Sequence, residues 1–214
     1  VLSLAVWLSS VGSMIRRDQE AASATLSELL QVAERLGHHI WLIQGQLTIG
    51  NLMSKAGRTA EGLSLARSAF DAIESTGIVA ARTWFTLMLA ECCERAGQVE
   101  EAIALLDKAL AIAERTEERL FEAELHRLRG DWILALRDAS PAEAEACYRR
   151  AIAVAVSQGA KLWELRAACS LARMLRDQNQ PMAARETLHP VYAWFTEGFD
   201  TPDLKDAKAL LEEL

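Results

Sequence analysis

Two stretches of the chain, GNLMSKAGRTAEGLSLARSAF at residues 50–70 and AECCERAGQVEEAIALLDKAL at residues 90–110, align with each other without a gap. The shift between them is 40 residues, so that Gly57 lies over Gly97 and Gly62 over Ala102. Self-similarity at a fixed period of this length is the signature of a repeat architecture. The chain is therefore expected to consist of repeated structural units.

The repeat extends in both directions from this pair. Linker residues recur 40, 40 and 42 residues apart, the longer step coming from the turn LRDASPAE at residues 136–143. These linker residues are Gly37, Gly77, Glu117 and Gly159. Small residues keep the same spacing in two columns, which are Gly50, Ala90, Gly130 and Ala172, and Ala22, Gly62, Ala102, Ala144 and Ala184. The predicted units are approximately residues 1–37, 38–77, 78–117, 118–159 and 160–198, and a terminal cap covers residues 199–214.

Each unit contains two apolar stripes of helical period separated by a turn. Before the second stripe of the fourth unit, Ser140 can cap a helix, Pro141 suits its first position and Glu143 can complete a capping box. Only 4 Pro and 11 Gly occur, and no strand pattern is present. We predict an all-α fold, a helical-repeat solenoid of about five antiparallel helix pairs with a C-terminal capping helix.

Composition excludes several classes of function. The chain is 51% hydrophobic and 25% charged, and its formal net charge of -7 opposes binding to nucleic acid. The opening LAVWLSSVGSMIRR, residues 4–17, is too short to span a bilayer and follows neither an initiating Met nor a basic leader. We interpret it as the first buried helix of a fragment of a larger protein, with no membrane partner.

The four cysteines indicate a reducing compartment. They fall at apolar positions of helical patterns and show no CxxC spacing, so small reduced core residues are expected rather than a disulfide framework. A cytoplasmic location follows from this interpretation. The cysteines are Cys92, Cys93, Cys147 and Cys169.

The paired columns of small residues resemble the tetratricopeptide repeat (TPR). The standard TPR unit is about 34 residues long, whereas this one spans 40 to 42, which implies longer helices. The chain is therefore described as TPR-like. The resemblance implies that the first helix of each pair lines an inner, concave surface.

A narrower resemblance rests on AELHRLRGD at 123–131, AEAEACYRRAIAVA at 142–155, WELRAACSLARMLRDQ at 163–178 and PVYAWFTEGFDTPDLKDAKALLEEL at 190–214. These strings look like the C-terminal region of large bacterial signalling proteins. In that family an adenylate or guanylate cyclase-like domain and a STAND-type ATPase domain precede a long helical repeat array. The motifs of the cyclase and of the ATPase are not in this sequence.

No catalytic, cofactor-binding or metal-binding residues are predicted, and the chain is not expected to be an enzyme. It has no GxxxxGK[ST] loop, and its four histidines lack the HExxH spacing of a zinc site. Its carboxylates suit exposed helical faces. His126, inside a helix, is interpreted as a polar residue at the edge of a groove or as a ligand contact.

The TPR resemblance projects a set of partner-binding residues onto the inner face. In the projection, acidic residues precede basic ones along the array, so the groove would carry separated charge suited to a peptide or polar ligand. The alternative is that these charges only solvate a curved face. Trp84 is either an anchor in the groove or a wedge buried between units. The predicted groove residues are Gln44, Asn51, Trp84, Glu91, Glu124, Arg127, Asp131, Arg166 and Arg173.

The first unit differs because its projected inward residues are apolar: Leu4, Trp7, Val11 and Met14. A solvent-facing strip of this kind is unusual on a monomer. It predicts packing against preceding repeats, or alternatively a homodimer contact.

The leading functional prediction is a noncatalytic scaffold in a cytoplasmic bacterial signalling protein, which binds a protein, a peptide or other domains of its parent chain. The alternative is a small-molecule sensor that regulates attached ATPase or cyclase domains. A deep pocket near Trp84 or His126 would favour the sensor.

The end of the chain is predicted to be a lid. Gly198 is expected to close the preceding helix in a left-handed conformation, with Phe199 folded onto Trp194, and Thr201 to cap the last helix. Pro190 is expected to kink the preceding helix and steer Trp194 and Phe195 toward the core. The apolar stripe of the last helix, Leu204, Ala207, Leu211 and Leu214, would then seal the fifth unit.

Overall fold

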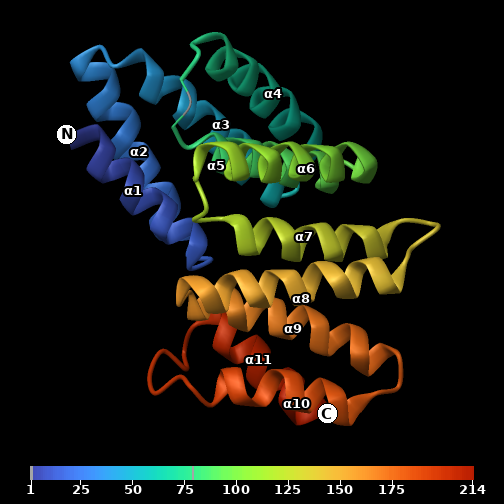
Figure 1. Cartoon of the computed structure of the whole chain (residues 1–214). Coiled ribbons are helices and arrows are strands. Elements are labelled where there is room, and N and C mark those ends of the chain that lie inside the picture. Colours follow the sequence, from blue (N-terminus) through green and yellow to red (C-terminus); the bar gives the residue numbers. More distant parts are fainter. Residues whose placement is uncertain (1, 79) are drawn as a thin grey trace. The chain divides into compact units, whose positions relative to one another are not determined.

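A computed structural model describes residues 2–78 and 80–214, which form eleven α-helices and no strand (Figure 1). The chain divides into two compact units, residues 1–109 and 110–214. The first unit contains α1 (Leu2–Ile15), α2 (Gln19–Leu36), α3 (His39–Lys55), α4 (Thr59–Ser75), α5 (Arg82–Arg95) and most of α6 (Val99–Thr116). The second contains the end of α6, α7 (Glu122–Ala135), α8 (Pro141–Gln158), α9 (Lys161–Asp177), α10 (Pro181–Tyr192) and α11 (Pro202–Glu213).

A recurring tight turn closes the first helix of several pairs. Gly57 and Gly97 take left-handed φ values of 87° and 77°. In each case the next residue donates its backbone N–H to a carbonyl five residues earlier, Arg58 to Met53 at 3.0 Å and Gln98 to Cys93 at 2.9 Å. This bond satisfies a carbonyl that the end of the helix leaves unpaired. The α7–α8 turn is different, because Ser140 caps α8 through the N–H of Glu143, as the sequence predicts.

The four linker residues that recur along the repeat, called the linker column, all have a left-handed backbone conformation. Gly37, Gly77 and Gly159 have φ values of 66°, 71° and 64°, and Glu117 has 59°. Glycine takes this conformation without steric cost, whereas a side chain at the same place is strained. The spacing therefore marks a geometric requirement of the backbone. The division of the sequence into five units stays a prediction.

The columns of small residues lie where paired helices approach each other. A Cβ on Gly50 would come within 2.7 Å of the carbonyl oxygen of Gly62, so α3 and α4 meet almost backbone to backbone. A Cβ on Gly130 would lie 2.6 Å from the ring of Tyr148, which is 1% exposed. The alanines of both columns are buried. The predicted fold class, an all-α repeat of TPR-like helix pairs with a capping helix, is confirmed.

Helix α1 packs differently from the predicted solvent-facing strip. Trp7 contacts the rings of Trp41 and Phe85, with centroids 6.0 and 6.2 Å away, and Val11 is buried. Of the four predicted residues, only Leu4 is classed as exposed. The strip is therefore largely used inside the first unit, whereas Leu2, Leu4 and Leu8 of α1 are 49%, 47% and 55% exposed. A homodimer contact through α1 stays a prediction.

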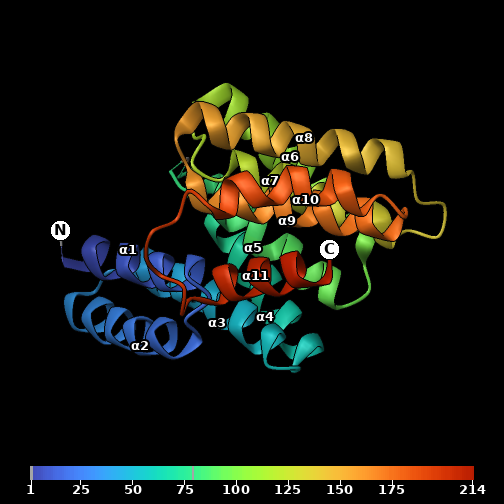
Figure 2. The same ribbon diagram turned by 90° about the horizontal axis from the view of Figure 1, so that it is seen from below.

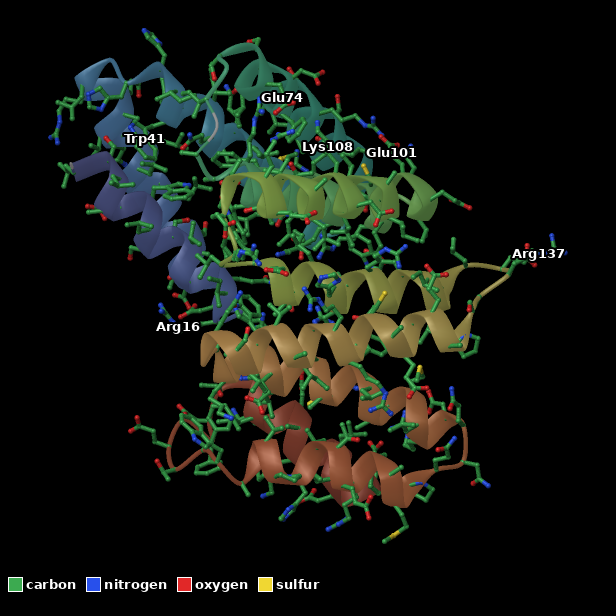
Figure 3. All side chains as sticks on the ribbon, viewed as in Figure 1. Arg16, Trp41, Glu74, Glu101, Lys108 and Arg137 are labelled. Carbon is green, nitrogen blue, oxygen red and sulfur yellow. The ribbon has the colours of Figure 1, made fainter. Side chains whose placement is uncertain are left out.

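Ionic contacts cross from α6 to α4 within the first unit. Lys108 Nζ lies 3.2 Å from a carboxylate oxygen of Glu74, and Arg67 pairs with Glu101 at 2.6 Å. Figure 3 shows Glu74, Lys108 and Glu101 gathered around these two helices. These pairs are 30–47% exposed, so each contributes little to stability.

The predicted capping helix is confirmed, whereas the turn before it differs from the prediction. Leu204, Ala207 and Leu211 are buried, and α11 packs on α9 and α10 (Figure 2). Helix α10, however, ends at Tyr192, two residues after Pro190, and its C-cap is Ala193 rather than Gly198. Pro190 removes a backbone donor and so favours this early end.

The aromatic residues after α10 also differ from the prediction. Phe199 contacts the ring of Tyr192, not that of Trp194, and Trp194 is 58% exposed. Because the helix stops at Tyr192, Trp194 and Phe195 leave the apolar stripe that would have carried them inward. Thr201 holds the N-cap position of α11 without a side-chain cap, and its hydroxyl donates to the carbonyl of Gly198 at 2.6 Å.

The four cysteines are free thiols buried in the helical core, as the sequence predicts. Burial raises the pKa of the Cys92, Cys93 and Cys169 thiols to about 11. These groups are therefore protonated near neutral pH and poor nucleophiles. None of the described helices combines the length and apolarity that a membrane span requires.

Candidate functional site

In the first unit, Asn51 and Glu91 join α3 to α5. Asn51 is 0% exposed, and its Nδ2 donates to the carbonyl of Met88 at 3.0 Å and to Glu91 Oε2 at 2.9 Å. Lys55 and Arg95 approach the same carboxylate at 3.3 and 3.7 Å. Burial alone would raise the pKa of Glu91, but the two cations and the amide outweigh it and lower that pKa. The contacts stabilise the first unit.

The other two predicted groove residues of this unit are buried. Trp84 is 6% exposed, so its side chain is a buried wedge rather than an open anchor. Gln44 is also 6% exposed, and its Oε1 accepts no hydrogen bond from any described residue. Of the four residues predicted here, Glu91 is the most exposed, with 21% of its side chain accessible to solvent.

In the second unit, Arg127 is the centre of a polar network on α7 and α9. Its guanidinium binds both oxygens of Glu124 at 2.8 Å and also donates to Asp131 and to the hydroxyl of Ser170. Tyr148 donates to the second oxygen of Asp131 at 2.8 Å. Burial would lower the pKa of Arg127, but Glu124 and Asp131 raise it, so this cation keeps its proton.

Arg166 extends the network to the capping helix. It forms a two-pronged ion pair with Asp203 of α11, at 2.8 and 2.7 Å, and lies 3.8 Å from Glu124. Its guanidinium also lies over the ring of Trp163, 5.0 Å from the centroid. Paired, planar contacts of this kind are the strong form of ion pairing.

The structure thus brings together Glu124, Arg127, Asp131 and Arg166, while Arg173 is exposed outside this network. The predicted separation of charge is not formed in the second unit, because each acid meets a base within a few ångströms. Sequence reasoning missed Asp203, Tyr148 and Ser170 as partners. Asp203 was visible only as an acid in the first turn of a helix, a pattern with no long-range information.

A cavity of about 360 Å³ lies elsewhere in the second unit, between the end of α6, α7 and α8. Glu122, 8% exposed, lies between two cations at its wall, 3.5 Å from Arg119 and 3.6 Å from Arg150. The remaining lining residues are Leu110, Ala111, Glu114 and His126. The volume is within the range of small-molecule sites. Among the described residues no group of three or more His, Cys, Asp or Glu side chains is arranged to hold a metal ion.

Comparison with known proteins agrees with this fold. A tetratricopeptide repeat family model matches residues 80–155, so the chain contains a TPR-like region. An uncharacterised protein of Rhizobium meliloti (strain 1021) is 29% identical over 168 residues, which are 77% of this chain. The chain spans only 16% of the length of that relative.

Solved structures with low sequence identity share the architecture. The TPR-like repeats of a putative kinesin light chain from Podosopora anserina have a TM-score of 0.63 at 20% identity, covering 80% of this chain and 84% of that one. A Rap protein complexed with Competence and Sporulation Factor has a TM-score of 0.71 at 16% identity, covering 93% and 53%. BtubC from P. vanneervenii has a TM-score of 0.66 at 16% identity, covering 93% and 89%.

Proposed function

We propose that the chain is a noncatalytic interaction scaffold that binds a protein, a peptide or another domain of its parent protein through the polar face of α7 and α9. The observation that carries this proposal is the network around Arg127, which holds carboxylates and guanidinium groups in fixed positions on two neighbouring first helices. Side chains positioned in this way lose little conformational freedom when a partner binds. One structural neighbour, the Rap protein, was solved in a complex with Competence and Sporulation Factor.

Within this face, we assign contact with the partner to Asp131 and Arg173. The side chain of Asp131 is 33% exposed, and Arg173 is exposed. Arg173 follows Ser170 by three residues, so it shares the face of α9 that meets Arg127. The more buried Glu124, Arg127 and Arg166 position these two residues. A bacterial signalling role in the cytoplasm remains part of the proposal, on the resemblance of the chain to the array of cyclase and ATPase proteins.

The test compares two charge reversals in affinity purification with the tagged chain. Arg173→Glu changes the proposed face, whereas Arg137→Glu makes the same change at the exposed tip of the α7–α8 turn (Figure 3). We expect a partner that wild type and Arg137→Glu retain with equal affinity, and that Arg173→Glu binds at least about tenfold more weakly. Equal affinity of all three forms for the partner would refute binding through this face.

The cavity supports a second candidate function, a small-molecule sensor. Its wall offers guanidinium groups from Arg119 and Arg150 beside the carboxylates of Glu114 and Glu122. We propose a ligand that carries both a carboxylate and an ammonium group, such as an amino acid or a dipeptide. In a thermal-shift panel of such compounds, a binder should raise the melting temperature of wild type and of His189→Ala but not of His126→Ala. An unresponsive wild type would remove this candidate.

A further inference from the structure

The segment between α10 and α11, residues 193–201, presents aromatic side chains to solvent. Trp194 is 58% exposed and Phe199 is 48% exposed. We call this segment the aromatic loop. Both views show it looping out from the ends of the neighbouring helices (Figures 1 and 2). Large aromatic residues exposed within one short segment are a feature of interaction surfaces.

The loop is held in one conformation by its own contacts. The ring of Phe199 meets Tyr192 edge to face at 6.0 Å, which ties the two ends of the loop together. Gly198 takes a φ of 76°, and its carbonyl accepts both the hydroxyl and the N–H of Thr201. The positive φ of Gly198 and the two hydrogen bonds to its carbonyl give this part of the loop a defined turn conformation.

Trp194 is supported on its inner side. The ring of Phe195 stands perpendicular to it at 5.2 Å, and the ammonium group of Lys161 lies 5.5 Å from the Trp194 centroid. Lys161 is itself paired with Glu164 at 2.7 Å. The indole is therefore oriented in advance of any partner, which lowers the entropic cost of binding.

The charge of the loop indicates which partner fits. Residues 193–203 contain no Lys, Arg or His, and the exposed Glu197 and Asp200 flank the aromatic side chains. The nearby cation, Lys161, is already paired with Glu164. Acids at the rim of an apolar contact favour a partner with complementary positive charge. They also disfavour an anionic membrane, since the surface potential of such a membrane repels carboxylates.

We infer that the aromatic loop is a docking surface, with Trp194 as its anchor, for a protein partner that offers an apolar pocket bordered by Lys or Arg side chains. The aromatic loop shares no residue with the polar face of α7 and α9. The two can therefore fail independently: Arg173→Glu tests the face, and changes at Trp194 test the loop. Trp and its aromatic neighbours are the residue types that dominate binding energy at protein interfaces.

The experiment selects a phage-displayed library of random dodecapeptides against the whole chain. We expect enriched peptides that combine large apolar residues with Lys or Arg. A fluorescent copy of the best peptide, followed by anisotropy, should bind Trp194→Ala at least about tenfold more weakly than wild type. The matched control is Met182→Ala, which removes another apolar side chain, 70% exposed, from the start of α10.

A second pair of variants tests the charge. Glu197→Gln with Asp200→Asn should weaken the peptide several-fold, whereas Glu100→Gln with Glu186→Gln, the same change in net charge at other exposed acids, should leave its affinity unchanged. Unchanged melting temperatures in all variants would show that each one folds. Enrichment of acidic peptides, equal affinity for Trp194→Ala, or no enrichment at all would overturn the inference. So would Trp194-dependent binding to phosphatidylcholine vesicles with 30% phosphatidylserine in place of peptide binding.

Discussion

At the scale of single residues, the linker column shows how backbone geometry constrains side-chain choice. Three of its four residues are glycines with positive φ, and the fourth, Glu117, takes the same conformation with a side chain. For residues other than glycine the left-handed region costs roughly 1–2 kcal/mol. Glu117 is thus the one residue of this column that takes the left-handed conformation with a side chain. The resulting strain can be measured as a change in stability.

The change Glu117→Gly should stabilise the chain by about 0.5–1 kcal/mol. Glycine removes the strain of a φ of 59°, although its freedom in the unfolded chain offsets part of the gain. Chemical denaturation at neutral pH would measure the difference. The matched control is Gly159→Ala, which should cost about 1 kcal/mol through φ alone, because its added Cβ would meet no atom within 4 Å. A loss of stability in Glu117→Gly would contradict the assignment of strain.

Glu91 should make part of the stability depend on pH. Its pKa is lowered in the folded protein, so the carboxylate contributes stability above the unfolded pKa of about 4.3 and loses it as the pH falls through the lower folded value. The free energy of unfolding of Glu91→Gln should fall below that of wild type at pH 7, and the gap should narrow below about pH 4. Denaturation curves at the two pH values would measure it. A gap that stays constant would show that Glu91 acts through shape alone.

At the scale of elements, two kinds of contact hold neighbouring helices: close backbone approach and buried ion pairs. Helices α3 and α4 use the first, through Gly50 and Gly62. Helices α9 and α11 use the second, through Arg166 and Asp203, whose side chains are 14% and 9% exposed. The close backbone approach requires that no side chain be present, whereas the ion pair requires two charged side chains. Substitutions at the two kinds of contact are therefore expected to act differently.

Gly62→Ala should destabilise the chain by about 2–3 kcal/mol. The new Cβ would stand 2.5 Å from the carbonyl oxygen of Gly50 and 2.7 Å from the N of Ser54, both backbone atoms that move only if α3 and α4 separate. Thermal unfolding would measure the loss. Gly12→Ala in α1 is the control, since its Cβ would meet only the flexible end of Arg16 at 3.5 Å, and it should be neutral or slightly stabilising. Equal effects of the two substitutions would argue against the close approach.

Asp203→Ala should destabilise the second unit by about 3 kcal/mol, because the largely buried guanidinium of Arg166 loses its two-pronged partner, while Glu124 lies farther away, at 3.8 Å. The control is Glu213→Ala, which breaks another ion pair between the same helices, that with Arg176. Arg176 and Glu213 are 35% and 58% exposed, so that loss should be within about 0.5 kcal/mol. If both variants melted at the same temperature, the buried pair would contribute no more than the exposed pair to the packing of α11.

At the scale of the whole molecule, we expect the energetics of a repeat array, in which each helix pair is stabilised mainly by its neighbours. Within the second unit α9 contacts α7, α8, α10 and α11. Local openings in such arrays occur at the ends more readily than in the middle. A change that loosens α11 should therefore open the last repeat locally, without unfolding the rest of the chain.

Hydrogen exchange can test this locality. In Asp203→Ala, amide exchange should accelerate in α9, α10 and α11, while α2, α3 and α4 should keep their wild-type protection. The reason is that α11 contacts only α9 and α10 among the contacts described within the second unit. Accelerated exchange spread evenly over both units would instead show that the chain unfolds as one cooperative body.

Periodicity in the sequence was enough to predict the helix pairs, the capping helix and the positions of close helix contact. Those features arise from local requirements: a side-chain repeat of three to four residues, a left-handed residue at most turns, and small residues where backbones meet. Each requirement is met by residues that lie within the element it specifies or a few positions from it. The amino-acid pattern alone therefore assigns Gly50 and Gly62 to a helix contact.

The tertiary structure alone decided how the charges pair and which aromatic side chains of the aromatic loop stay exposed. Arg166 and Asp203 are 37 residues apart, and their contact depends on how α11 docks on α9, which no local pattern records. Trp194 is a large aromatic residue of a type expected in a core. Helix α10 nevertheless ends at Tyr192, and the indole is 58% exposed. Burial and ion pairing depend on the distances between elements, and those distances exist only once the helices have packed.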